Sequence, residues 1–147
     1  MHRWINETGA KDDPFDVIID DGGHSNMQQY NSFMVLFEHA LRPGGIYVLE
    51  DIHCSRNFVD GDKEHVMIEV IKDWIEILVM GPSQVPAVEG KSYTPKFKLP
   101  PRIRSIDCWT EACVFTKCFK SDARCSEPSH ASLESYSDKG TAMLSAG

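Results

Sequence analysis

The 147-residue chain lacks long apolar runs, and its basic residues are outnumbered by acidic ones. A membrane-spanning helix needs about 20 consecutive apolar residues, and every run here is interrupted well short of that. The N-terminal segment MHRWINETGAKDD also lacks the apolar core of a secretory signal. With 15 Lys+Arg against 22 Asp+Glu, the net charge of −7 argues against nucleic acid or an anionic membrane as a partner. We therefore expect a cytoplasmic protein.

Cysteine is also scarce and irregularly spaced. The chain has five, an odd number, without a C-x-x-C pair or zinc-type spacing. The pattern predicts reduced, mostly structural thiols and no disulfide framework. The residues concerned are Cys54, Cys108, Cys113, Cys118 and Cys125.

Two β-branched runs flank an amphipathic segment in the first third of the chain. Phe15–Asp20 is apolar without alternation, which predicts a strand buried on both faces of a parallel sheet. Residues 27–41 have apolar side chains at helical spacing, with Ser25 or Asn26 as N-cap and Pro43-Gly44-Gly45 as the stop. Ile46–Leu49 repeats the strand pattern. Together these elements predict a βαβ unit with parallel strands.

The remainder of the chain predicts one helix, one hairpin and a tail. Apolar residues at helical spacing indicate a helix from about Asp62 to Val79. Residues 81–101 contain five of the eight prolines and predict an irregular connection. Two strands at 103–109 and 112–117, separated by Thr110-Glu111, predict an antiparallel hairpin. Residues 1–120 are thus expected to form the folded domain, and the Ser-rich residues 121–147 a disordered tail.

Acidic residues follow both strands of the βαβ unit, in the segments Asp20-Asp21-Gly22-Gly23-His24 and Glu50-Asp51-Ile52-His53. Parallel strands end at the same sheet edge, about 4.8 Å apart when adjacent, so the carboxylates should converge. Two unit charges about 4 Å apart repel by roughly 4 kcal/mol at an effective dielectric of about 20, which favours binding of a cation. Oxygen ligands suit Mg²⁺, Mn²⁺ or Ca²⁺. The alternative is that these turns are acidic only because they are solvated.

His24 is the candidate general base beside this acidic edge. Gly22 and Gly23 permit a turn with positive φ that would bring His24 back over the strand ends. His53 is interpreted as a polar residue at the rim, and Cys54 as an unreactive neighbour. Glu64 and His65 are expected in the first turn of the second helix.

The same residues resemble a known family. Phe15–His24 and Leu41–Asp51 are similar to the class I S-adenosylmethionine-dependent methyltransferases, and more narrowly to the metal-dependent sugar O-methyltransferases of macrolide biosynthesis. The resemblance covers roughly residues 12–118. It implies an α/β fold, a partial Rossmann-like methyltransferase sheet comprising strands four to seven with flanking helices. In that sheet the hairpin supplies the last two strands.

The resemblance also implies roles for individual residues. Asp21, Glu50 and Asp51 would hold Mg²⁺ or a similar divalent cation, and His24 would take a proton from the acceptor. Two further positions, Asp20 and Gly22, would face the methionine part of S-adenosylmethionine. The expected acceptor is a hydroxyl of a sugar or similar small molecule.

One departure from the family concerns the cofactor. Such enzymes begin with a strand and a glycine-rich loop, and nothing before Phe15 matches these, so the chain resembles only the C-terminal half of the catalytic domain. An alternative is therefore a non-catalytic methyltransferase-like module, with the exposed edge of the 15–20 strand forming a homo-oligomer or binding a partner. A metal-dependent hydrolase ranks last, because no further ligand motif is present.

Overall fold

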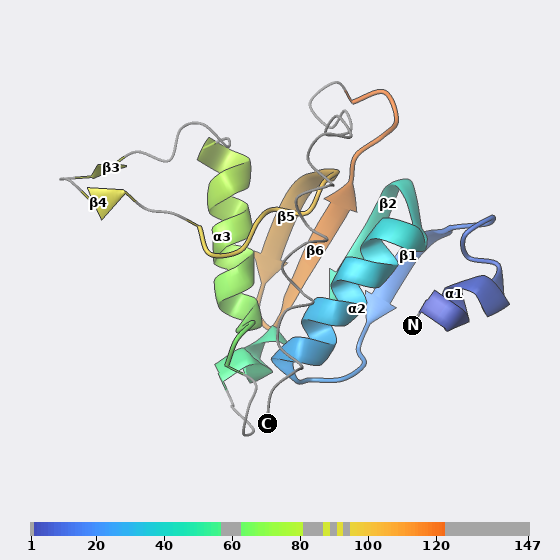
Figure 1. Ribbon diagram of the computed structural model, residues 1–147, viewed down its shortest axis with the longest axis horizontal. Coiled ribbons are helices and arrows are strands. Elements are labelled where there is room, and N and C mark those ends of the chain that lie inside the picture. Colours follow the sequence, from blue (N-terminus) through green and yellow to red (C-terminus); the bar gives the residue numbers. More distant parts are fainter. Residues whose placement is uncertain (1, 57–62, 81–86, 89–90, 93–94, 123–147) are drawn as a thin grey trace, which may run out of the picture.

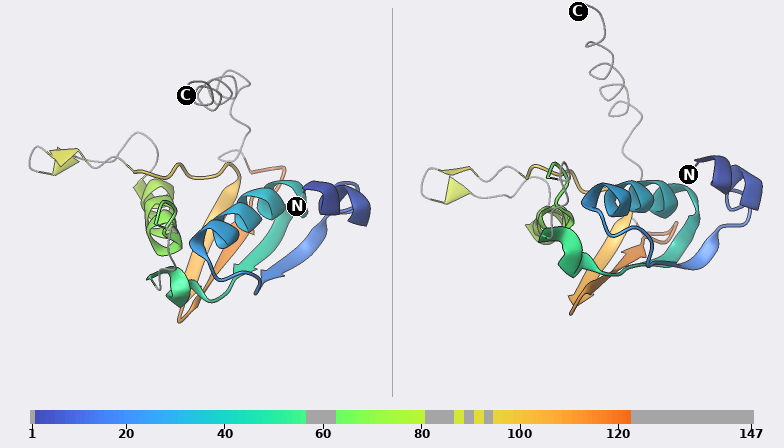
Figure 2. Two further views of the ribbon diagram at one scale, coloured as in Figure 1. Left: turned by 60° about the horizontal axis from the view of Figure 1, so that its bottom comes forward. Right: turned by 90° about the horizontal axis from the view of Figure 1, so that it is seen from below.

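The computed structural model describes residues 2–56, 63–80, 87–88, 91–92 and 95–122 (Figure 1). A four-stranded sheet carries two long helices on one face, as Figure 2 shows from two further sides. The elements are α1 (His2–Thr8), β1 (Phe15–Asp20), α2 (Asn26–His39), β2 (Leu41–Leu49), the 3₁₀ helix η1 (Ile52–Arg56), α3 (Met67–Met80), β3 (Ala87–Val88), β4 (Lys91–Ser92), β5 (Ile103–Trp109) and β6 (Ala112–Lys117).

The sheet has the strand order β1-β2-β6-β5. β1 and β2 are parallel, with Val17 opposite Ile46 and Asp20 opposite Leu49. β6 runs antiparallel to both β2 and β5, which confirms the hairpin. This arrangement confirms the expected partial Rossmann-like sheet, and the Asp20–Leu49 register makes β1 and β2 end at the same level.

The crossover helix α2 begins at a capping box. The Ser25 hydroxyl accepts a hydrogen bond from the Gln28 amide at 3.3 Å, and the Gln28 side chain accepts one from the Ser25 amide at 3.4 Å. The helix ends at His39, and Pro43-Gly44-Gly45 lies inside β2 instead of ending the helix. A register shift between Phe15 and Val17 accommodates this segment, because Pro43 has no N–H to donate to the ladder.

Aromatic rings fill the layer between the sheet and the two helices. Phe33 of α2 is fully buried, and its ring centroid lies 5.0 Å from that of Tyr47 on β2. It also lies 5.0 Å from the Trp74 ring on α3 and 4.6 Å from the Phe115 ring on β6. One ring on α2 thus contacts three other elements, and this core fixes the helices against the sheet.

The opposite face of β1 is exposed. The prediction that this strand is buried on both faces is wrong: 50% of Val17 and 64% of Ile19 are accessible, whereas Ile18 packs against the core beneath α2. Side chains alternate across a strand, and within the described residues both long helices lie on the Ile18 side (Figure 2). An apolar strand surface is left uncovered as a result.

The later elements differ from expectation at their boundaries. Helix α3 begins at Met67, Asp62 lies outside the described residues, and Glu64 and His65 form a turn before the helix. His65 lies there because its ring packs 4.3 Å from that of Tyr30. β3 and β4 pair within the segment expected to be irregular. Residues 123–147 of the expected tail lie outside the described residues.

No helix in the described part has the length and apolar content needed to cross a bilayer.

A buried lysine donates hydrogen bonds to carbonyl groups at the C-terminal end of α2. Lys117, at the end of β6, is 2% exposed and donates hydrogen bonds to the carbonyls of Phe37 (2.6 Å), Glu38 (3.0 Å) and Leu41 (2.8 Å). Carbonyls at a helix C-terminus have no partners within the helix, and a cation is favourable there. Burial nevertheless lowers the pKa of Lys117 to about 8, while nearby Glu38 acts in the opposite direction.

Substituting Lys117→Met should lower the free energy of unfolding at pH 7 by about 2 kcal/mol, because buried carbonyls lose their partners. The folded-state pKa of Lys117, about 8, lies below the ordinary 10.5, so the unfolded chain binds more protons between these values. Stability of the wild type should therefore rise with pH relative to the variant in this window. Urea unfolding of both proteins from pH 7 to 10.5 measures the difference. A constant difference across that range would contradict the assignment.

Candidate functional site

The candidate site lies where β1 and β2 end together. The Glu50 amide donates a hydrogen bond of 3.1 Å to the Asp20 carbonyl, which joins the two strand ends. The following turns, residues 21–25 and 50–52, therefore leave the sheet side by side. The prediction that both acidic segments meet at one edge is confirmed by this pairing.

Three predicted site residues come together at this edge. One ligand atom each from Asp21, His24 and Asp51 lies within 4.8 Å of the others. The His24 Nδ1 is 3.3 Å from Asp51 Oδ2, and both side chains are partly accessible to solvent. Glu50 belongs to neither of the two groups of potential metal ligands in the described residues. Its predicted role as a ligand stays a prediction.

The turn geometry differs from the expected one. Neither Gly22 nor Gly23 has positive φ; Asp51 has it instead, with φ of 56°. Aspartate tolerates this left-handed region better than most residues, because its short polar side chain can bond locally. At Gly22 an added Cβ would lie 3.0 Å from Asp20 Oδ1, a close contact that a shift of the Asp20 carboxylate would have to relieve.

Asp20 is tied to the sheet by Tyr47. The buried Tyr47 hydroxyl donates a short hydrogen bond to Asp20 Oδ2 across the β1–β2 pair. Burial, together with the hydrogen bond to Asp20, raises the pKa of Tyr47 well above its ordinary value, so the phenol stays protonated and remains a donor. Asp20 is thereby fixed at the end of β1, and its predicted contact with a cofactor stays a prediction.

A second group of potential ligands shares Asp51. The His53 Nδ1 lies 3.6 Å from Asp51 Oδ1 and 3.8 Å from Glu111 Oε1. Sequence reasoning placed His53 at the rim and gave Glu111 no role beyond a hairpin turn. The turn reaches this edge because the Ile52 amide donates a 2.8 Å hydrogen bond to the Glu111 carbonyl. No sequence pattern predicts this contact between η1 and the hairpin turn, which are far apart in the chain.

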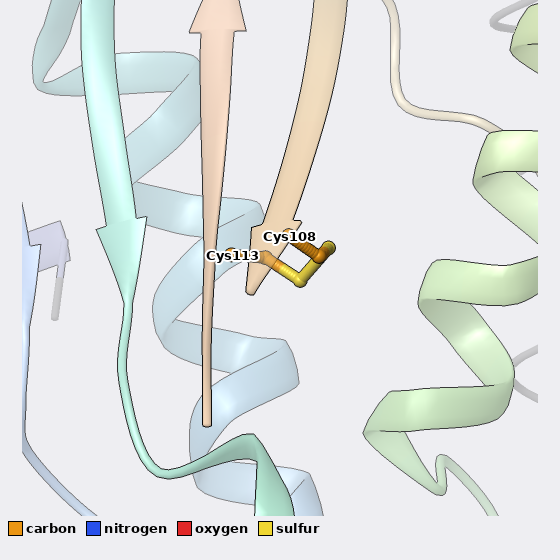
Figure 3. The surroundings of a disulfide bond; sticks show 2 residues. All are labelled: Cys108 and Cys113. Carbon is orange, nitrogen blue, oxygen red and sulfur yellow. A yellow bond between two sulfur atoms is a disulfide. The ribbon is translucent and has the colours of Figure 1, made fainter. Parts of the chain in front are cut away.

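A disulfide lies at the end of the hairpin that carries Glu111 (Figure 3). Cys108 and Cys113 are register partners on β5 and β6, with their Cα atoms 4.1 Å apart. Cys118 is also disulfide-bonded, so the expectation of reduced thiols is wrong; Cys54 is free. The β5–β6 register brings Cys108 and Cys113 together, and the spacing of the cysteines in the sequence does not predict this bond.

One surface hollow of the described residues lies away from this edge. This hollow of about 400 Å³ lies at the start of α3, with Lys63, Glu69 and Phe97 among its lining residues. None of the carboxylates at the β1–β2 edge lines it, and its walls mix lysines with glutamates. This hollow is therefore separate from the candidate site.

The donor atoms at this edge fit a hard divalent cation. Asp21 and Asp51 offer carboxylate oxygens, the ligands that Mg²⁺ and Mn²⁺ prefer, within reach of one position. The His24 imidazole lies at the same position, against Asp51.

The four-stranded sheet with its flanking helices is similar to part of a methyltransferase fold. Solved structures of MycE, a methyltransferase from the mycinamycin biosynthetic pathway, share it. A MycE complex with Mg and SAH is 25% identical with a TM-score of 0.53, over 86% of this chain and 33% of that chain. A MycE complex that also holds mycinamycin VI is 24% identical with a TM-score of 0.51, over 79% and 28%.

The chain resembles sugar O-methyltransferases in sequence as well. A demethylmacrocin O-methyltransferase from Streptomyces fradiae is 50% identical over 48 residues, 33% of this chain and 12% of the relative. An L-olivosyl-oleandolide 3-O-methyltransferase from Streptomyces antibioticus is 60% identical over 55 residues, 37% and 13%. The match thus spans about an eighth of the length of these curated relatives. No family model matches the chain.

Removing the disulfide with Cys108→Ser should lower the free energy of unfolding by about 2 kcal/mol, the chain-entropy value for so short a loop. Glu111 should lose its fixed position next to His53 because the hairpin end opens. Thiol labelling under denaturing conditions, with and without reductant, checks the bond, and urea unfolding checks its contribution. Labelling of Cys108 without reductant in the wild type would contradict the disulfide.

Proposed function

We propose that this chain forms the metal-binding and proton-accepting part of an S-adenosylmethionine-dependent O-methyltransferase. Its acceptor would be a hydroxyl of a sugar or a similar small molecule. The observation that carries the proposal is the convergence of Asp21, His24 and Asp51 at one sheet edge. It is supported by the 50–60% identity of local segments to sugar O-methyltransferases. The MycE structures with Mg and SAH support the same pair of cofactors.

Asp21 and Asp51 would hold the divalent cation, with Glu50 as a further ligand from the same turn. When bound, the cation supplies Lewis acidity that makes a coordinated hydroxyl easier to deprotonate.

His24 would take the acceptor proton. Asp51 Oδ2 lies 3.3 Å from Nδ1 and orients the ring, which leaves Nε2 to accept the proton from the hydroxyl. When bound, S-adenosylmethionine would supply the methyl group, whose bond to the sulfonium sulfur would break as the acceptor oxygen bonds to the methyl carbon. Asp20 and Gly22 would lie beside its methionine part.

The double substitution Asp21→Asn with Asp51→Asn should weaken Mn²⁺ binding at least tenfold, because two carboxylate ligands lose their charge. Titration of Mn²⁺ into the chain, followed by electron paramagnetic resonance, measures the affinity. Glu7→Gln with Asp12→Asn is the matched control, since it removes the same charge from exposed positions far from the edge. Equal losses in both proteins would mean that only general electrostatic attraction holds the ion.

A second candidate is a module that pairs with another chain through β1. The specific observation is an exposed apolar face at the edge strand β1, where Val17 and Ile19 are 50% and 64% accessible and Ile46 of the neighbouring β2 is 38% accessible. Unpaired backbone groups on an edge strand favour pairing with a further strand. The partner would be a second copy or a separate chain, and the metal site would then be structural.

If the edge mediates self-association, Ile19→Lys should convert an oligomer to a monomer, because a charged side chain on an edge opposes strand pairing. Size-exclusion chromatography with light scattering over a range of concentrations measures the mass. Val79→Lys, on the exposed side of α3, is the matched control. A wild-type protein that is monomeric at all concentrations would exclude self-association.

A further inference from the structure

The first turn of α2 carries two buried amide side chains. Asn26 and Gln29 are 3% and 2% exposed, on a helix whose other buried residues are Phe33 and Phe37. Amide side chains are seldom buried unless they bond to specific partners. The contacts of these two residues lead to the segment that carries the proposed metal ligands.

Asn26 joins the two ends of the segment that follows the site. Its Nδ2 donates a 2.9 Å hydrogen bond to the carbonyl of Ser55, at the end of η1. Its Oδ1 accepts a 2.8 Å bond from the amide of Met67, the first residue of α3. One side chain thus fixes where η1 ends and where α3 begins.

Gln29 bonds the main chain directly before Asp51. Its Nε2 donates a 3.0 Å hydrogen bond to the Glu50 carbonyl. Its Oε1 is buried and has no hydrogen-bond partner, which destabilises the fold. A leucine or methionine would fill similar space without that orphan oxygen, so the benefit of glutamine lies in the bond to Glu50.

We propose that Gln29, assisted by Asn26, is a positioning residue that holds the Glu50–Asp51 turn in its metal-binding geometry. Asp51 has φ of 56°, a conformation that the chain must stabilise from outside. The Gln29 bond fixes the carbonyl on one side of Asp51, and the Ile52–Glu111 bond fixes the amide on the other. The link to metal binding rests on the proposed function.

The test uses the full 147-residue chain and the variant Gln29→Met, which keeps the length of the side chain and removes the donor. We expect the dissociation constant for Mn²⁺ alone to rise at least tenfold, with an unfolding midpoint near the wild-type value, because removal of the orphan oxygen offsets the loss of the bond to the Glu50 carbonyl. Phe37→Leu is the matched control: it lies on the same helix face, should lower the midpoint, and should leave Mn²⁺ affinity within twofold. A Gln29→Met variant with wild-type affinity would overturn the proposal.

A second measurement needs no metal. Hydrogen exchange of the Ile52 and Cys54 amides, which donate to Glu111 and Asp51 carbonyls, should accelerate at least tenfold in Gln29→Met relative to amides of the β2–β6 pair. Unchanged relative exchange would overturn the positioning role. In the wild type, one proton of the Gln29 side-chain amide should exchange slowly, and fast exchange of both would overturn it as well.

The two measurements separate the two proposals. If the wild type binds no Mn²⁺ but exchange at Ile52 and Cys54 responds to Gln29→Met, the metal step of the proposed function fails and the positioning role stands. If the wild type binds Mn²⁺ and neither readout responds, the proposed function stands and the positioning role fails.

Discussion

The parallel pairing of β1 with β2 is the constraint on which the rest of the structure depends. Asp20 opposes Leu49, so two turns separated by an entire helix leave the sheet at one level and bring their acidic side chains together. The aromatic core beneath α2 stabilises this pairing. The exposed carboxylates repel one another, so the free energy of core packing must exceed the cost of that repulsion. The chemistry of the edge is therefore a product of strand register more than of any single loop.

The sequence predicted the elements whose patterns are local. Apolar periodicity predicts β1, α2, β2 and the hairpin, and the parallel crossover then predicts that Asp21, His24 and Asp51 lie at one edge, as they do in the structure. The predicted helix ends were less accurate than the predicted elements themselves. Pro43-Gly44-Gly45 is typical of a helix end, but the same residues can also lie in an irregular part of a β-strand, as they do in β2. Tertiary pairing with Phe15 decided between the two.

Features that depend on distant segments could not be predicted. Glu111 meets His53 only because the hairpin turn packs against η1, and the Cys108–Cys113 bond requires a register that sequence spacing does not encode. The buried roles of Gln29 and Lys117 were missed for the same reason. Each is a polar residue in an apolar pattern, and its partners are main-chain groups that carry no sequence signal.

Helix α2 is anchored at both ends, which limits how this part of the chain can vary. Ser25 and the two amides secure its first turn, and Lys117 secures its last carbonyls. Its 14 residues span about 21 Å, close to the length of about 20 Å expected for the six residues of β1. One inserted residue would rotate everything beyond it by about 100° and turn one set of anchors away from its partners. An insertion or deletion within this helix should therefore disturb the acidic edge, whereas a substitution that keeps the anchors should not.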